Sequence, residues 1–126
     1  MSERKFLRSY DKKSSKISMS SQHSSLAAGR WQQFTLAEQL GHVGSEVSRT
    51  RKAFGDEQRY WSAATRAFEL LDLTIEDSRW QPRLRELLRV REVLADAVLG
   101  GSEYKSSLED VDKYFLSFAR AAQAGR

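Results

Sequence analysis

The sequence lacks several features that would place it in a common class of protein. Its 126 residues include no cysteine, which excludes disulfide frameworks and thiolate metal sites and fits a reducing compartment. No apolar run approaches the roughly 20 residues of a membrane-spanning helix, and no segment alternates apolar and polar side chains as a half-buried strand does. These absences predict an all-helical, cytoplasmic protein with no role for a membrane.

Positive charge is abundant only near the N-terminus. The whole chain has a net charge of +4, but residues 1–30 hold seven basic and two acidic side chains, a net of +5, together with nine serines. Residues 31–126 then hold 14 basic and 15 acidic side chains, a net of −1. Low hydrophobicity and like charges favour disorder. We therefore predict a basic, Ser-rich disordered tail over 1–30 and one folded domain over 31–126. Initiation at Met19 instead of Met1 stays open, and it would remove six of the seven basic residues in 1–30.

The segment after the tail predicts two helices. From Leu36 to Phe54, apolar residues recur at spacings of three and four, which is one helical stripe. Thr35 and Glu38 fit a capping box at its start. The second helix follows from Asp56, and its apolar residues form a broad face.

Two further helices follow in the C-terminal half of the chain. The third opens near Pro82, a favoured first helical residue, and is stopped by Gly100 and Gly101. The fourth starts at Ser106, which fits a second capping box with Glu109. Short links between helices favour antiparallel neighbours, so the domain is predicted to be an all-α, antiparallel four-helix bundle.

Two of the helices carry candidate contact surfaces. Gly41 and Gly44 belong to a row of small residues on the first helix, and each glycine costs about 1 kcal/mol relative to Ala. Close approach of another helix backbone would offset that cost. The broad face of the second helix includes Trp61 and Phe68, and it is wide enough to contact two helices or another subunit. We therefore predict that Gly41, Gly44, Trp61 and Phe68 contact a protein partner or a second copy of the chain.

Basic side chains make nucleic acid the alternative partner. Arginine grips phosphate and stacks on bases, and basic residues beside an aromatic such as Trp80 suit single strands. The candidate contacts are Lys12, Lys13, Lys16, Arg79, Arg83, Arg85 and Arg89, with Arg91 nearby. The preceding helix is rich in acidic residues, however, and such a charged face more usually forms interhelical salt bridges.

Catalytic and metal-binding patterns are sparse. His23 and His42 are the two histidines, and neither stands in the His-x-x-x-His or Glu-x-x-His spacing of a metal site in a bundle. His42 could activate Ser45 or Ser48 on the same helix face, but no nucleophile-elbow motif accompanies it. We predict no cofactor, no metal and no small-molecule substrate.

Four blocks of the sequence resemble a set of small bacterial four-helix proteins to which no activity is attached. The blocks read FTLAEQLGHVGSEVSR, RAFELLDLTIED, LRELLRVREVLAD and KYFLSFARAA. The predicted architecture is also similar to the four-helix accessory proteins of diversity-generating retroelements. That resemblance implies a basic oligomer that binds a reverse transcriptase and its RNA, whereas this domain has a net charge of −1.

Three hypotheses about function follow from the sequence. The first is a non-catalytic helical adaptor that self-associates or docks on a protein partner. The alternative is a nucleic-acid-associated accessory subunit, for example of a reverse transcriptase ribonucleoprotein, that uses the tail and the arginines of the third helix. The third is an enzyme centred on His42, such as a nuclease.

Overall fold

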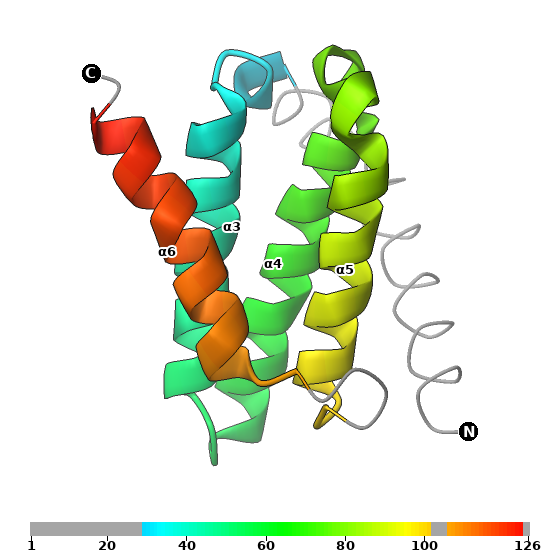
Figure 1. The fold of residues 1–126 in the computed structure, drawn as a ribbon. Helices are drawn as coiled ribbons and strands as arrows, with labels where there is room; N and C mark the ends of the chain where they lie inside the picture. Colours follow the sequence, from blue (N-terminus) through cyan, green and yellow to red (C-terminus); the bar gives the residue numbers. More distant parts are fainter. Residues whose placement is uncertain (1–28, 102–105, 125–126) are drawn as a thin grey trace.

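The computed structural model describes residues 29–101 and 106–124. Within these ranges the backbone is entirely helical outside the connections, with no strand (Figure 1). The described helices are α3 (Leu36–Lys52), α4 (Glu57–Glu76), the short 3-10 helix η1 (Ser78–Arg83), α5 (Leu84–Val98) and α6 (Leu108–Ala124). None of them is long and apolar enough to cross a membrane. The tail predicted over 1–30 lies outside the described residues, except that Gly29 and Arg30 form a helical turn with Trp31.

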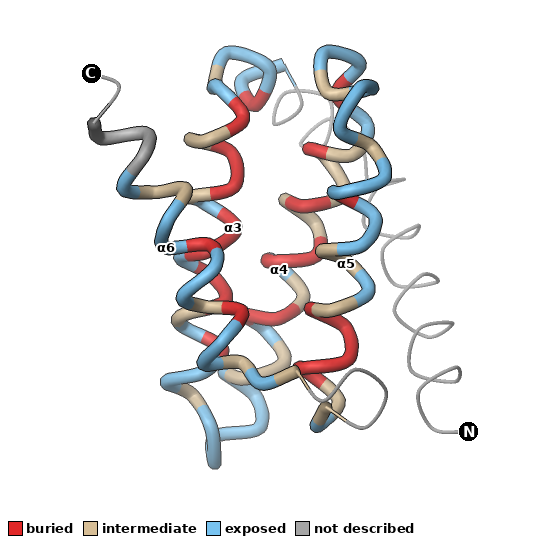
Figure 2. The backbone as a smooth tube through the Cα atoms, in the orientation of Figure 1, coloured by how far each residue is buried: buried red, intermediate tan, exposed pale blue. Residues whose placement is uncertain are grey.

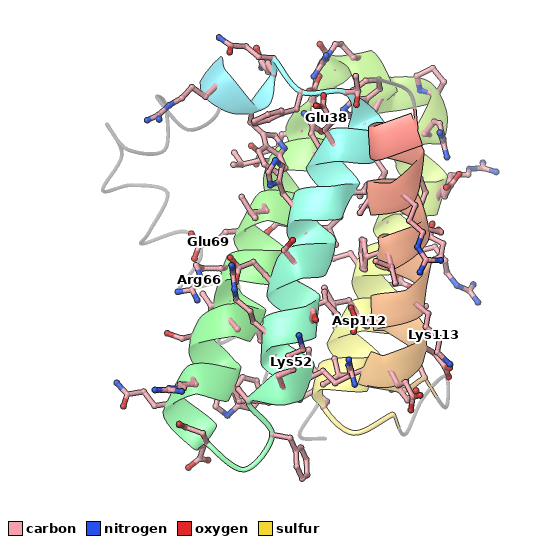
Figure 3. The ribbon with its side chains drawn as sticks, turned by 90° about the vertical axis from the view of Figure 1, so that its left-hand side faces the viewer. Glu38, Lys52, Arg66, Glu69, Asp112 and Lys113 are labelled. Atoms are coloured by element: carbon pink, nitrogen blue, oxygen red, sulfur yellow. The ribbon has the colours of Figure 1, made fainter. Side chains whose placement is uncertain are left out.

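The start of α3 confirms the predicted capping box. The backbone N–H of Glu38 donates to Thr35 Oγ1 at 3.1 Å, and Glu38 Oε1 accepts from the backbone N–H of Thr35 at 2.9 Å. The helix also places charge where its dipole favours it, since Glu38 lies in the first turn and Lys52 in the last (Figure 3). α4 follows Asp56 as predicted, and Asp56 caps it by accepting from the backbone N–H of Arg59 at 3.3 Å.

The starts of α5 and α6 correct the sequence prediction. Pro82 lies inside η1, and α5 begins two residues later at Leu84. The cap at Ser106 is also wrong, because Ser106 Oγ donates to Asp96 Oδ2 at 2.7 Å instead. Ser107 takes the capping role and accepts from the backbone N–H of Asp110 at 3.1 Å. A contact with another helix therefore decides which of two adjacent serines caps α6.

Each of the four α-helices contributes large apolar side chains to one core. The buried residues line the inward faces of the helices, as Figure 2 shows. The largest apolar side chains in it are Leu40, Val43 and Val47 of α3, Phe68 and Leu71 of α4, Leu87 and Leu94 of α5, and Phe115 of α6. Burying each of these side chains stabilises the fold by roughly 1.5–3 kcal/mol.

The helices are packed unevenly around this core. α3 makes its most extensive contacts with α4 and α6, while α5 contacts α4 and α6 much less. In Figure 1, α6 starts beside the end of α5 and diverges from it toward its own C-terminal end. One side of the molecule, between α5 and α6, is therefore less closely packed than the others.

Candidate functional site

The row of small residues on α3 accommodates a helix of the same chain. A Cβ atom placed on Gly44 would lie 2.5 Å from Phe115 Cβ, and one placed on Gly41 would lie 3.3 Å from Ala119 Cα. The close approach predicted from the glycines is therefore present, but its partner is α6. We correct the assignment of Gly41 and Gly44 to an intermolecular contact accordingly.

The other two predicted contact residues differ in exposure. Phe68 is only 1% exposed and belongs to the core cluster, so it presents no surface to a partner. Trp61 is half-buried on the outer side of α4, edge-on to Tyr60 with ring centroids 5.1 Å apart. It lines a shallow depression with Thr65, Arg66 and other polar side chains.

An apolar groove lies between α5 and α6, where the packing is loosest. It has a volume of about 470 Å³, and its lining residues are Glu86, Arg89, Val90 and Val93 of α5, Ser106 before α6, and Asp110, Val111 and Tyr114 of α6. Its lining is more apolar than polar. Covering the apolar surface of such a groove with a partner is favourable, because it removes that surface from water.

Tyr114 stands at the edge of the groove in a defined position. Its ring packs edge-on against Phe115 and Phe118, with ring centroids 5.5 and 5.3 Å apart. Its side chain remains 37% exposed, and partial burial, more than the nearby charge of Glu86, raises the pKa of its hydroxyl. Sequence reasoning did not foresee the groove, because the angle between α5 and α6 is not encoded in either helix alone.

A buried polar cluster closes the end of the molecule where α3 begins and α4 ends. Gln39 is fully buried and bridges three partners through its side-chain amide. Its Nε2 donates to Trp31 O at 2.8 Å and to Asp77 Oδ2 at 3.1 Å, and its Oε1 accepts from Trp80 Nε1 at 2.9 Å. Trp31 Nε1 donates in turn to Thr74 Oγ1 at 3.1 Å. The cluster thereby fixes the chain segment that leads into α3.

Arg79 closes the cluster on its solvent side. Its Nη2 donates to Asp77 Oδ2 at 2.7 Å and to Phe34 O at 2.8 Å. The hydrogen bonds from Arg79 outweigh the opposing effect of burial and lower the pKa of Asp77 to about 2. The same pairing raises the pKa of Arg79. No buried side-chain nitrogen or oxygen in the described part of the chain lacks a hydrogen-bond partner.

Several of the candidate phosphate-binding arginines pair with carboxylates of the same chain. Arg79 pairs with Asp77, and Arg83 Nη2 lies 2.8 Å from Glu86 Oε1. Arg91 of α5 pairs with Asp72 of α4 through Nε and Oδ1 at 2.7 Å, which confirms the predicted interhelical salt bridges. Arg85 and Arg89 are exposed on α5. Lys12, Lys13 and Lys16 lie outside the described residues.

His42 takes part in aromatic packing. Its ring lies 5.7 Å from Trp31 and 4.9 Å from Phe34, measured between centroids. Ser45 Oγ donates to Gly41 O at 3.3 Å, so its hydroxyl hydrogen is directed toward the backbone of α3. In the part of the chain that the structure describes, no three acidic or histidine side chains come together as metal ligands would. His23 lies outside that part.

The comparisons with known proteins do not assign the chain to a family. No protein-family model matches the sequence, and neither a curated protein nor a solved structure matches it. The fold and site therefore define an all-helical protein with an open apolar groove, and the two resemblances drawn from sequence stay predictions.

Proposed function

We propose that the chain is an antiparallel four-helix bundle that acts as a non-catalytic adaptor and binds an amphipathic helix in the groove between α5 and α6. The observation that carries this proposal is the groove itself. Val90 and Val93, which are partly exposed, line it together with the buried Val111, between two helices that make few contacts with each other.

The chemistry of the groove selects a helix over other ligands. An amphipathic helix lays apolar side chains, spaced three and four apart, into a groove between two helices. Its polar side then meets the charged lining residues, of which Glu86 and Asp110 are acidic and Arg89 is basic. Tyr114 suits the role of an anchor, because a partly exposed tyrosine supplies apolar area and a hydroxyl at little entropic cost.

Site-specific photocrosslinking in the cell that makes the protein tests this proposal. A photoreactive phenylalanine replaces Tyr114 in one full-length variant and the 86% exposed Phe54 in the control variant. We expect protein adducts from position 114, because its side chain would lie in the interface. Val93→Glu should suppress these adducts, while Thr65→Glu on the outer side of α4 should not. Equal adduct formation from positions 114 and 54, or adducts that survive Val93→Glu, would contradict the proposal.

A further inference from the structure

We infer that Asp96 and Ser106 are positioning residues for the groove: their hydrogen bond holds the start of α6 against the end of α5 and thereby sets the opening at which the groove accepts a helix. The inference rests on the proposed function, since it names residues that set the specificity of the same groove. Asp96 is only 4% exposed, and burying a carboxylate costs free energy unless hydrogen bonds satisfy it.

The contact between Asp96 and Ser106, called the corner contact from here on, is short and involves two groups of Ser106. Ser106 Oγ donates to Asp96 Oδ2 at 2.7 Å, and the backbone N–H of Ser106 donates to the same oxygen at 3.4 Å. Ser106 Oγ also lies 3.2 Å from Val93 O. The residue that leads into α6 is therefore held by groups that α5 supplies.

The backbone at the end of α5 is shaped around the same contact. The N–H of Gly101 donates to Asp96 O at 2.8 Å, and Gly101 has a φ of +81°, a conformation that favours glycine. A Cβ atom added at Gly101 would overlap Ser106 O. Asp96 thus holds the chain on both sides of the connection, at Gly101 and at Ser106.

The rest of α6 packs mainly on α3 and makes few contacts with α5. Phe115 lies against Gly44 of α3 along the middle of α6. Across the groove, Tyr114 Oη donates to Glu86 Oε1 at 3.5 Å, which is a long and exposed hydrogen bond. Packing on α3 therefore fixes one side of α6, and the corner contact fixes the start of α6 relative to α5.

The corner contact lies at the end of the groove from which α6 departs (Figure 1). Ser106 itself lines the groove, and Val93, whose carbonyl lies beside Ser106 Oγ, lines it from α5. Val111 and Tyr114 follow on the first two turns of α6. A shift of the start of α6 moves both side chains relative to Val93. Because the apolar side chains of a partner helix must pack closely between them, the corner contact sets which helix fits.

The distance between α5 and α6 in the full-length chain tests the inference. The chain has no cysteine, so Arg85→Cys and Lys113→Cys provide nitroxide sites at exposed positions of α5 and α6 that do not line the groove. We expect a narrow distance distribution by pulsed electron spin resonance in this doubly labelled parent. Ser106→Ala should broaden the distribution and shift its mean, and Ser106→Thr, which keeps a hydroxyl, should restore it.

Ser107→Ala is the matched control, because Ser107 is the adjacent serine and caps α6 by accepting from the backbone N–H of Asp110 at 3.1 Å. Its loss should lower the stability of the fold but leave the distance between the nitroxides unchanged. Equal far-UV circular dichroism of the variants shows that each is folded. An unchanged distance in Ser106→Ala, or an equal change in Ser107→Ala, would overturn the inference.

Photocrosslinking from position 114 adds a readout of binding. We expect Ser106→Ala to remove most of the protein adducts, while Ser106→Thr and Ser107→Ala keep them. If Ser106→Ala changes the distance but keeps the adducts, the inference fails and the proposed function stands. If the unsubstituted groove gives no adducts from position 114, the proposed function fails and the inference falls with it.

Discussion

A Cβ atom added at Gly44 would lie 2.5 Å from the Cβ of Phe115, which is closer than side chains pack. Gly44 is therefore required by the approach of α6 to α3, and Phe115 is fully buried as a result. We expect Gly44→Ala to destabilise the protein by up to about 2 kcal/mol, because an overpacking cost of about 1–3 kcal/mol is opposed by a gain in helix propensity of only about 1 kcal/mol. Urea unfolding followed by circular dichroism measures this change.

Gly41→Ala is the matched control for the same contact. Its added Cβ would lie 3.3 Å from Ala119 Cα, so a shift of a few tenths of an ångström relieves the overlap. The gain in helix propensity then offsets most of the cost, and we expect a change within about 0.5 kcal/mol. Equal destabilisation by the two substitutions would show that the distance between α3 and α6 differs from the one described here.

The same two glycines show how far sequence reasoning extends. Local signals were sufficient for the capping box at Thr35, because both of its residues lie within one turn. The small side chains at Gly41 and Gly44 also indicated a close helix contact. They could not identify the partner, because α6 is more than 60 residues away along the chain and any helix backbone satisfies the same pattern.

Contacts between distant segments account for the other differences. Ser106 loses its capping role because Asp96 of α5 binds its hydroxyl. The cluster around Gln39 was not foreseen either, since its partners Asp77 and Trp80 lie 38 and 41 residues away. The groove between α5 and α6 depends on the angle at which two helices diverge, and that angle follows from packing against α3 and α4.

Gln39 should be among the polar side chains whose loss costs the most stability. Gln39→Leu keeps the volume but leaves Trp31 O, Trp80 Nε1 and one oxygen of Asp77 each short of a hydrogen bond. We expect a loss of about 2–4 kcal/mol in the free energy of unfolding. Gln33→Leu is the control, because Gln33 is exposed and its replacement should change stability by no more than about 0.5 kcal/mol. Similar urea midpoints for the two variants would contradict the prediction that the hydrogen bonds of Gln39 stabilise the fold.

Asp77 should make stability depend on pH in the acid range. Its pKa is lowered from 3.8 to about 2 in the folded chain, so the unfolded chain binds the proton more tightly. The stabilisation is therefore present above pH 4 and is lost as the pH falls through 2, and it amounts to at most about 2.4 kcal/mol. Asp77→Asn should be less stable than the parent at pH 7, and the difference should shrink between pH 4 and 2. A difference that stays constant over this range would show that Asp77 has an ordinary pKa.

Arg91 tests whether the arginines of α5 act within the fold or on a phosphate backbone. Its guanidinium pairs with Asp72 and lies 5.3 Å from the ring centroid of Phe68, so both partners lose contacts in Arg91→Ala. The pair is mostly buried, and we expect a loss of about 1–2 kcal/mol in the free energy of unfolding. Arg85→Ala is the control, because Arg85 is exposed and its loss should change stability by less than about 0.5 kcal/mol.

Binding of the same two variants to single-stranded nucleic acid distinguishes a structural role of these arginines from a phosphate-binding role. A phosphate contact releases counterions, so its loss weakens binding and flattens the dependence of affinity on salt. We expect Arg91→Ala to lower stability without changing that dependence, because Asp72 already neutralises the guanidinium. A salt slope that becomes shallower in Arg91→Ala, with stability unchanged, would instead place this arginine on a nucleic-acid surface and favour the accessory-subunit hypothesis over the adaptor.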